Sequence, residues 1–195
     1  MTRLVRLSLA LLLLGFGTVA LGQNLVTNGS FGSGDFTGWM LSGNTSFTGV
    51  CNAETCPGGF TPDSNYGAFF GAVDEPTTLQ QTVATTTGDQ YTLSFYLADP
   101  QGGAPDYFAV NFGSASTTMD NFAGSFGWQE YELTTTANSS ETVLSFSLRN
   151  NPGFWFLSNI MVEESPGNAP EPGTIVLFAT GLLGIAGVAR RKLGR

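Results

Sequence analysis

Apolar side chains recur at every second position through the middle of this chain, and this pattern restricts the fold more than any other feature. Tyr91, Leu93, Phe95 and Leu97 share one face of such a stretch, while the intervening residues are polar or amphipathic. A period of two is typical of β-strands with one buried face. The same alternation returns in three further sets, namely Phe108, Val110 and Phe112; Leu144, Phe146 and Leu148; and Phe154, Phe156, Ile160 and Val162.

The segments between these stretches have the composition of turns. Cys56-Pro-Gly-Gly and Gln101-Gly-Gly-Ala-Pro are examples, and Gly and Pro favour tight turns over helices. No helical period of useful length appears in the body of the chain. Many short strands joined by turns predict an all-β fold, a two-sheet antiparallel β-sandwich of jelly-roll type. Further strands are expected near 24–28, 38–42, 66–73, 78–83 and 128–135.

The charges of the chain are divided unevenly between its middle and its ends. From Asp35 to Glu164 one basic residue, Arg149, stands against fourteen acidic residues, a net charge of −13. Such a surface repels phosphate backbones and anionic headgroups, so we expect no nucleic-acid partner. The negative charge does not exclude cations or neutral molecules such as sugars as ligands. For Arg149 we expect a structural ion pair, with a contact to a ligand as the alternative.

The chain lacks the side chains that most hydrolytic sites use. It contains no histidine, the commonest general base and a common metal ligand. Glu130 and Glu132 share one strand face, as the two carboxylates of some glycoside hydrolases do, but Gln129, Tyr131 and Leu133 beside them form an ordinary buried face. We therefore interpret the two glutamates as solvated and expect no enzymatic activity.

Two cysteines lie close together in a loop rich in Gly and Pro. Cys51 and Cys56 enclose four residues, a spacing that matches neither the redox motif Cys-x-x-Cys nor a four-ligand zinc site. In an oxidising compartment this spacing favours a local disulfide. Two unpaired thiols are the alternative.

The first 22 residues have the organisation of a secretory signal. Arg3 and Arg6 form a short basic region, an apolar run follows from Leu7 to Phe16, and small residues precede Gln23. The apolar run is too short for a membrane span, so residues 1–22 are predicted to be a signal peptide removed before Gln23. A retained N-terminal anchor is the alternative.

The C-terminal region combines three signals in a fixed order. Pro170-Glu171-Pro172 lies in a linker predicted over 165–172, and a transmembrane helix with a basic tail is predicted over 173–195. Such a tail stays in the cytoplasm under the positive-inside rule, and an ordinary single-span anchor is the alternative. The residues of the basic tail are Arg190, Arg191, Lys192 and Arg195.

This arrangement resembles the PEP-CTERM sorting signal of Gram-negative bacteria that make extracellular polysaccharide. The resemblance implies that an exosortase-type sorting enzyme recognises Pro170, Glu171 and Pro172 and removes the helix. It also implies an intermediate in the inner membrane before processing. The processed protein would then reach the cell surface or the extracellular matrix.

The body of the chain, predicted as one β-sandwich domain over 23–164, carries a second resemblance. Asn24-Leu-Val-Thr-Asn-Gly-Ser-Phe, Gly38-Trp39, the strand at 91–95, Gly127-Trp128-Gln-Glu-Tyr131 and the strand at 154–162 follow one another in the same order as in carbohydrate-binding-module and galactose-binding-like jelly rolls. This resemblance implies the fold, whereas function depends on the site.

The same families hold a structural calcium ion with residues that this chain lacks. Gly32 follows Phe31 where those families usually have Glu, and Ser158 and Asn159 stand in place of a pair of Asp residues. Asn159 and main-chain carbonyls are the oxygen ligands that remain for calcium, and without the two carboxylates we expect this site to be weak or absent. We expect no other cofactor.

Sugar-binding sites stack aromatic rings on sugar faces and bind the hydroxyls with amides and carboxylates. Each aromatic candidate here has packing in the core or against a strand as its alternative role. Trp155 is predicted to be exposed because it points away from Phe154 and Phe156. The candidate ligand-binding residues are Trp155, Tyr66, Tyr96, Tyr107, Asp99, Asp106 and Asn111.

Together these features predict a non-enzymatic, surface-sorted β-sandwich that binds extracellular polysaccharide. The alternative is a structural matrix or adhesion protein that associates with other proteins, or with itself, through an exposed sheet edge.

Overall fold

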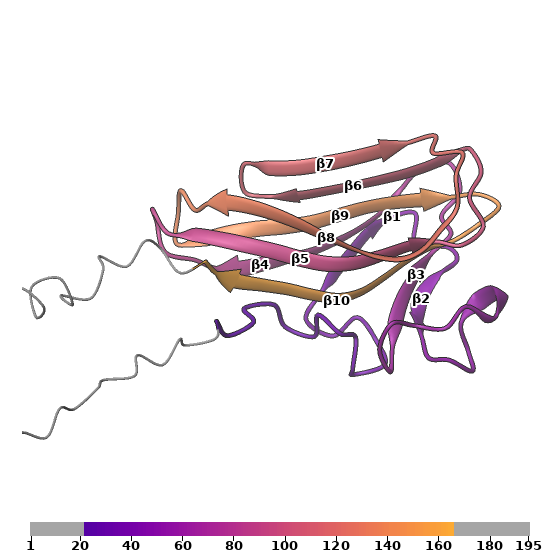
Figure 1. The fold of residues 1–195 in the computed structure, drawn as a ribbon, viewed down its shortest axis with the longest axis horizontal. Helices are drawn as coiled ribbons and strands as arrows, with labels where there is room; N and C mark the ends of the chain where they lie inside the picture. Colours follow the sequence, from indigo (N-terminus) through magenta and orange to yellow (C-terminus); the bar gives the residue numbers. More distant parts are fainter. Residues whose placement is uncertain (1–21, 166–195) are drawn as a thin grey trace, which may run out of the picture.

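The structure is a computed structural model that describes residues 22–165, and it confirms the predicted all-β sandwich. Two five-stranded sheets face each other, and every strand pairing is antiparallel (Figure 1). Sheet A contains, in spatial order, β1 (Met40–Gly43), β4 (Thr77–Ala84), β9 (Glu141–Asn150), β6 (Asp106–Phe112) and β7 (Ala115–Asp120). Sheet B contains β2 (Thr48–Cys51), β3 (Gly67–Phe70), β10 (Trp155–Glu164), β5 (Gln90–Asp99) and β8 (Phe126–Thr136).

Between residues 22 and 165 the one helical element is a short 3₁₀ turn, η1 (Pro57–Gly59). Within these bounds no helix has the length and apolar character needed to cross a membrane. The predicted transmembrane helix at 173–195, the sorting motif and most of the predicted signal peptide lie outside the described residues.

The core lies between the sheets and is built from the alternating apolar faces. Phe95 of sheet B meets Phe108 and Phe146 of sheet A, with ring centroids 5.8 and 5.2 Å apart. All three side chains are fully buried. Each such ring contributes about 1.5–3 kcal/mol through removal from water, so the face-to-face contact of the sheets is the main stabilising feature of the fold.

The predicted strand at 24–28 does not form, and a turn-rich segment runs along β10 instead. The Leu25 amide donates to the Val162 carbonyl and the Ile160 amide donates to the Gly29 carbonyl, while the Asn24 amide group donates to the Ile160 carbonyl at 3.2 Å. A Cβ atom at Gly29 would lie 2.0 Å from the Ile160 carbonyl oxygen. Glycine therefore permits the close approach, and a few separate main-chain and side-chain hydrogen bonds replace a regular strand pairing.

Apolar alternation did not predict β2 and β7, two short strands with few large apolar residues. β2 reads Thr-Gly-Val-Cys and β7 reads Ala-Ser-Thr-Thr-Met-Asp. Both strands lie at the edge of their sheets. An edge strand buries less of its surface than a central one, so its sequence shows little apolar alternation.

A β-bulge in β10 reverses which side chains face the core, and it overturns the prediction that Trp155 is exposed. Leu157 pairs with Leu97 and Val162 with Leu93, so β10 has one residue more than β5 between these pairs. The extra residue falls next to Asn159, which has a φ of 48°. An insertion of one residue exchanges the two faces of a strand, and Trp155 is consequently fully buried in the core.

A loop crosses the outer face of sheet B and covers a second apolar cluster. Cys51 and Cys56 are joined by a disulfide with Cα atoms 4.8 Å apart. Phe60, which follows η1, packs on Phe156 with ring centroids 4.6 Å apart, and Trp128 donates from Nε1 to the Thr61 carbonyl at 2.9 Å. Phe156 is therefore buried although it points away from the main core.

The described chain enters and leaves the sandwich at the same end (Figure 1). A Cβ atom at Gly22 would lie 3.1 Å from the Cβ of Glu163 near the end of β10. The connections at 100–105, 121–125 and 151–154 lie at the opposite end, since they follow β5, β7 and β9. We refer to this opposite end as the distal end.

Candidate ligand-binding face of sheet A

The outward face of sheet A is covered by hydroxyl and amide side chains arranged in register. In one row Gln80 pairs with Met40 and Ser145, and Asn111 pairs with Ser145 and Ser116. The next row toward the distal end contains Ser42, Thr78, Ser147, Ala109 and Thr118. Five strands about 4.8 Å apart make this face roughly 19 Å wide.

A pocket opens at the distal end of this face, where three strands of sheet A end together. Tyr107 lies between Arg149 of β9 and Asp120 of β7 in the register of β6. The pocket has a volume of about 460 Å³. Its lining combines a half-buried aromatic ring, one guanidinium group and two carboxylates, and consists of Gly43, Glu75, Pro76, Thr78, Tyr107, Asp120, Ser147 and Arg149.

Arg149 is held in this pocket by a main-chain contact. Its Nη1 donates to the Asp74 main-chain carbonyl at 2.8 Å, in place of the predicted ion pair. Nε of Arg149 is buried and has no hydrogen-bond partner. The guanidinium group is thus fixed at one nitrogen while it lines the pocket, a suitable arrangement for donating hydrogen bonds to a ligand.

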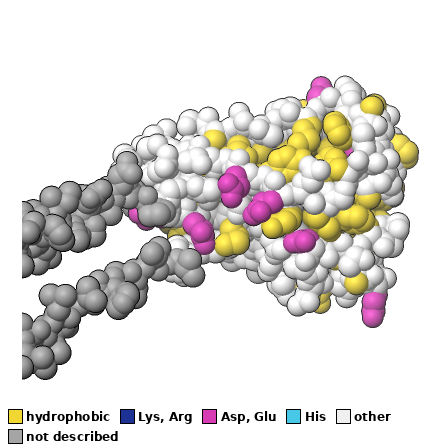
Figure 2. All heavy atoms as spheres, in the orientation of Figure 1, with side chains coloured by type: hydrophobic (Ala, Val, Ile, Leu, Met, Phe, Trp, Pro, Cys, Tyr) yellow, Lys and Arg dark blue, Asp and Glu magenta, His cyan; other side chains and the backbone are white. Residues whose placement is uncertain are grey.

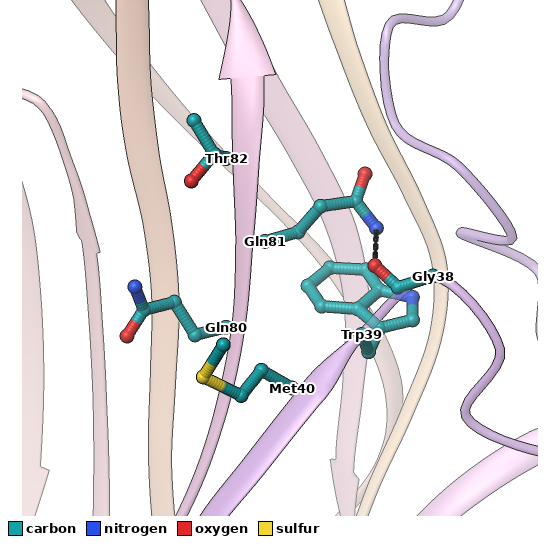
Figure 3. A pocket seen from close by; sticks show the side chains of 6 residues that line it. All are labelled: Gly38, Trp39, Met40, Gln80, Gln81 and Thr82. Carbon is teal, nitrogen blue, oxygen red and sulfur yellow. Dashed lines mark hydrogen bonds between the residues drawn. The ribbon is translucent and has the colours of Figure 1, made fainter.

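A second pocket of about 330 Å³ lies further along β4 (Figure 3). Gln80 and Met40 lie on one side of the strand, and Gln81 points to the other side, toward Trp39. Gln81 donates from Nε2 to the Gly38 carbonyl at 2.8 Å and accepts from the Thr27 amide at 2.7 Å. These bonds fix Gln81 as a structural residue, and Gln80 keeps its amide group at the surface.

On the outward face of sheet A the structure brings together two of the predicted ligand-binding residues. Tyr107 and Asn111 both lie on the outward face of β6 in sheet A. Tyr96 lies on the outward face of sheet B, where the negative charge of the neighbouring Glu130 raises the pKa of its phenol. Tyr66 lies in a third place, a small pocket that it shares with Ser30 and Ser64.

Asp99 and Asp106 do not lie at the surface with the tyrosines, because both are fully buried. Asp99 continues the buried face of β5 beyond Leu97, and Asp106 precedes Phe108 on the buried face of β6. Burial raises the pKa of both carboxyl groups, since a charged group is poorly solvated there. Neither residue can contact a polysaccharide on the outer surface.

Asn159, the weak candidate for a calcium ligand, contacts a carboxylate. Its Nδ2 donates to Oδ2 of Asp63 at 2.8 Å. No group of three or more His, Cys, Asp or Glu residues within 22–165 is placed to hold a metal ion. Asn159 therefore stays a weak candidate ligand for calcium.

The outward face of sheet B differs from that of sheet A in charge and in covering. Figure 2, drawn in the orientation of Figure 1, shows acidic side chains and apolar patches but no Lys or Arg on the face in view. Glu130 and Glu132 of β8 pair with Tyr96 and Ser94 of β5. The loop that carries the disulfide covers the part of sheet B near the distal end.

Most of the polar residues on the outward face of sheet A were not among the predicted ligand-binding residues, although the sequence pattern indicates that they point outward. Gln80, Ser145 and Ser147 alternate with Leu79, Leu144, Phe146 and Leu148, all fully buried. Positions between buried residues of a strand must point outward. Their side chains gather into one face only because β4, β9 and β6 are neighbours, and the spatial order of strands cannot be deduced from alternation.

Comparison with solved structures places the described domain among carbohydrate-binding-module-like β-sandwiches. The chain is similar to TmCBM61, solved in complex with β-1,4-galactotriose, with 20% identity, a TM-score of 0.58, and coverage of 73% of this chain and 99% of that one. It is also similar to the enzymatically active domain of tailspike protein 4 of bacteriophage CBA120, with 16% identity, a TM-score of 0.55, and coverage of 73% of this chain and 21% of that one. At these identities the likeness establishes the fold alone.

A comparison with curated protein sequences finds no match. A protein-family model does match the C-terminal region, from residue 168 to residue 192, and it includes Pro170, Glu171 and Pro172. The chain therefore carries a PEP-CTERM protein-sorting motif at residues 168–192.

Proposed function

We propose that this protein is an exported, surface-sorted and non-enzymatic carbohydrate-binding protein whose ligand is a neutral polysaccharide bound on the outward face of sheet A. The observation that carries the proposal is the registered array of Ser, Thr, Asn and Gln side chains on this face, which ends at the pocket containing Tyr107 and Arg149.

The chemistry of the array suits sugar hydroxyls. Ser and Thr hydroxyls and Asn and Gln amides both donate and accept hydrogen bonds, as sugar hydroxyls do. Tyr107 adds an aromatic ring against which an apolar sugar face can pack. The acidic body of the chain repels anionic polymers, so a neutral polysaccharide is the better ligand.

The fold supports the same proposal. TmCBM61 has a similar sandwich and was solved with a galacto-oligosaccharide. The similarity in fold makes an oligosaccharide ligand reasonable for this chain, and the specific residues on sheet A supply the argument for its location.

The sorting motif supports a role outside the cell. A PEP-CTERM motif implies processing by an exosortase, a membrane-bound intermediate, and delivery to the cell surface or the extracellular matrix of a Gram-negative bacterium. The described chain leaves the sandwich at the end opposite the Tyr107 pocket. The pocket thus faces away from the attachment point before the tail is removed.

The proposal is tested by retention of the full-length protein, solubilised in mild detergent, on a panel of immobilised neutral and acidic polysaccharides. Tyr107→Ala should weaken retention on the neutral ligand about fivefold to tenfold, as expected for the loss of one aromatic contact. Tyr96→Ala on sheet B is the matched control and should leave retention unchanged. Concentration-dependent self-association without retention on any polysaccharide would favour a structural matrix or adhesion protein instead.

The export step is tested separately in the native host by intact mass and cell fractionation. We expect loss of the first 22 or so residues and of the segment after Pro172. A variant with alanines at residues 170–172 should keep its tail in the membrane fraction. Retention of the tail in both proteins would indicate a plain membrane anchor.

A further inference from the structure

Three buried oxygen-bearing side chains meet between the two sheets near the distal end. Asp99 and Asp106 are fully buried and Asn150 is 1% exposed. Asp106 and Asn150 are direct partners across β6 and β9 of sheet A. Asn150 donates from Nδ2 to Oδ1 of Asp99 on sheet B at 3.2 Å, so the three side chains form one group that joins the sheets.

One oxygen of each carboxylate is held by a loop at this end. Oδ1 of Asp99 accepts from the Gly102 amide at 2.9 Å, and Oδ1 of Asp106 accepts from the Phe122 amide at 2.6 Å. These bonds attach the connections at 100–105 and 121–125 to the buried group. They also fix the orientation of each carboxylate, because only its second oxygen stays free.

The second oxygens have no hydrogen-bond partner. Oδ2 of Asp99, Oδ2 of Asp106 and Oδ1 of Asn150 are all buried and unpaired. A buried polar atom without a partner costs about 1–3 kcal/mol, and more if it is charged. Three such atoms in one group are unusual, since native interiors pair nearly all of their buried polar atoms.

A fourth oxygen lies beside the group. A Cβ atom at Gly153 would lie 3.0 Å from Oδ1 of Asn150 and 3.2 Å from Oε1 of Gln101. Gln101 Oε1 also accepts from the Phe154 amide at 3.0 Å. The connection at 151–154 therefore brings Gln101 and Asn150 close to the same point, next to Gly153, which has no side chain to occupy that space.

No basic side chain among residues 22–165 bonds these oxygens. Arg149 is the one basic residue in this part of the chain, and its Nη1 donates to the Asp74 carbonyl. The group therefore consists of oxygen ligands with two carboxylates and no hydrogen-bonded counter-charge.

We propose that Asp99, Asp106 and Asn150 bind a calcium ion between the sheets, with Gln101 as a further oxygen ligand. Calcium prefers six to eight oxygen ligands, drawn from carboxylates, Asn and Gln amides, main-chain carbonyls and water. Two carboxylates neutralise its charge. The site is separate from the weak candidate site at Asn159, a residue that lies at the β-bulge of β10 and contacts Asp63.

The ion would connect the interior to the pocket on the outer face. Asp106 precedes Tyr107 on β6, and Asn150 follows Arg149 on β9. Calcium would therefore hold the distal ends of these two strands in the register that places Tyr107 beside Arg149. An effect of calcium on ligand binding at this pocket rests on the proposed function, whereas the calcium site itself does not.

The site is tested by calcium binding to the full-length protein in detergent after treatment with a chelator. Calorimetry should show calcium binding to the wild type. Calcium at 100 times its dissociation constant should raise the unfolding temperature by about 8 °C. Asp106→Asn, which keeps the shape of the side chain, should abolish the shift. Asp63→Asn is the matched control at the other calcium candidate and should retain it.

Two further measurements test the calcium site even if the Asp106→Asn variant does not fold. Asn150→Asp adds a charged ligand and should bind calcium more tightly than the wild type, and unchanged affinity would contradict the proposal. Equal unfolding temperatures of the wild type in chelator and in calcium would overturn it outright. These readouts do not use polysaccharide, so their failure is distinguishable from a failure of the proposed function.

Discussion

The indole Nε1 of Trp155 donates a hydrogen bond to the main-chain carbonyl of Arg149 at 3.1 Å. Trp155 is the first residue of β10 in sheet B, and Arg149 lies next to the end of β9 in sheet A. The bond therefore crosses from one sheet to the other at the distal end. The Trp155 ring also contacts Phe108 and Phe126, with centroids 5.8 and 5.9 Å away.

Replacement of Trp155 by alanine should strongly destabilise the sandwich. A large aromatic side chain removed from a core costs about 3–5 kcal/mol, and the variant also loses the hydrogen bond from the indole to the Arg149 carbonyl. Trp155→Phe keeps most of the ring and should cost less. Urea unfolding followed by far-UV circular dichroism measures both values. A Trp155→Ala protein as stable as the wild type but unable to bind polysaccharide would restore the prediction of an exposed ligand-binding ring.

The position of Trp155 shows where alternation predicts a strand correctly and its faces incorrectly. The pattern of Phe154, Phe156, Ile160 and Val162 predicted β10 itself, but it assumed one unbroken period of two. The bulge beside Asn159 reverses the faces between Phe156 and Ile160. A bulge has no strong signature in a single sequence, so the error concerns one residue of register rather than the fold.

The burial of Asp99 and Asp106 could have been predicted from the sequence. Asp99 has the same parity as Leu93, Phe95 and Leu97, which alternation assigns to the core. Asp106 likewise shares the parity of Phe108 and Val110. Consistent use of the period predicts burial for both, whereas the meeting of Asp99 with Asn150 depends on which strands face each other across the core and could not be deduced.

Asp35 should make the stability of the protein depend on acid pH. Hydrogen bonds from the hydroxyl of Ser33 and from Thr37 hold the pKa of Asp35 below its ordinary value. Oδ1 of Asp35 accepts from Ser33 at 2.6 Å and from the Thr37 amide at 2.9 Å. A lowered carboxyl pKa in the folded state gives stability above the unfolded-state pKa and loses it as the pH falls through the folded value.

The Asp35 contribution is measured as the difference in unfolding midpoint between the wild type and Asp35→Ala at pH 7 and at pH 3. The wild type should be more stable at pH 7, and the difference should shrink at pH 3. Asp89→Ala serves as the control for general acid effects. A difference that stays constant between the two pH values would show that the carboxylate charge does not contribute.

Glu130 should control the ionisation of Tyr96 on the outer face of sheet B. The charge of Glu130, with burial and a hydrogen bond to the same carboxylate, raises the pKa of the Tyr96 phenol. Glu130→Gln removes the charge and should lower that pKa. The matched control is Glu132→Gln, which pairs with Ser94 on the same face. Titration of phenolate absorbance measures the pKa of Tyr96 in each variant. If both variants lower this pKa equally, the raised pKa comes from the overall negative charge of the face and not from Glu130 in particular.

Removal of the disulfide should loosen the loop on sheet B more than the sandwich core. A cross-link between Cys51 and Cys56 closes a short loop, for which chain entropy predicts about 2 kcal/mol. The double variant Cys51→Ser, Cys56→Ser should lose about this much stability in urea. Phe60 should also become exposed, because its packing on Phe156 depends on the path of the loop after η1. Trp128 fluorescence reports this change, since its indole bonds the Thr61 carbonyl. Unchanged Trp128 fluorescence despite the loss of stability would mean that Phe60 and Thr61 hold the loop in place without the cross-link.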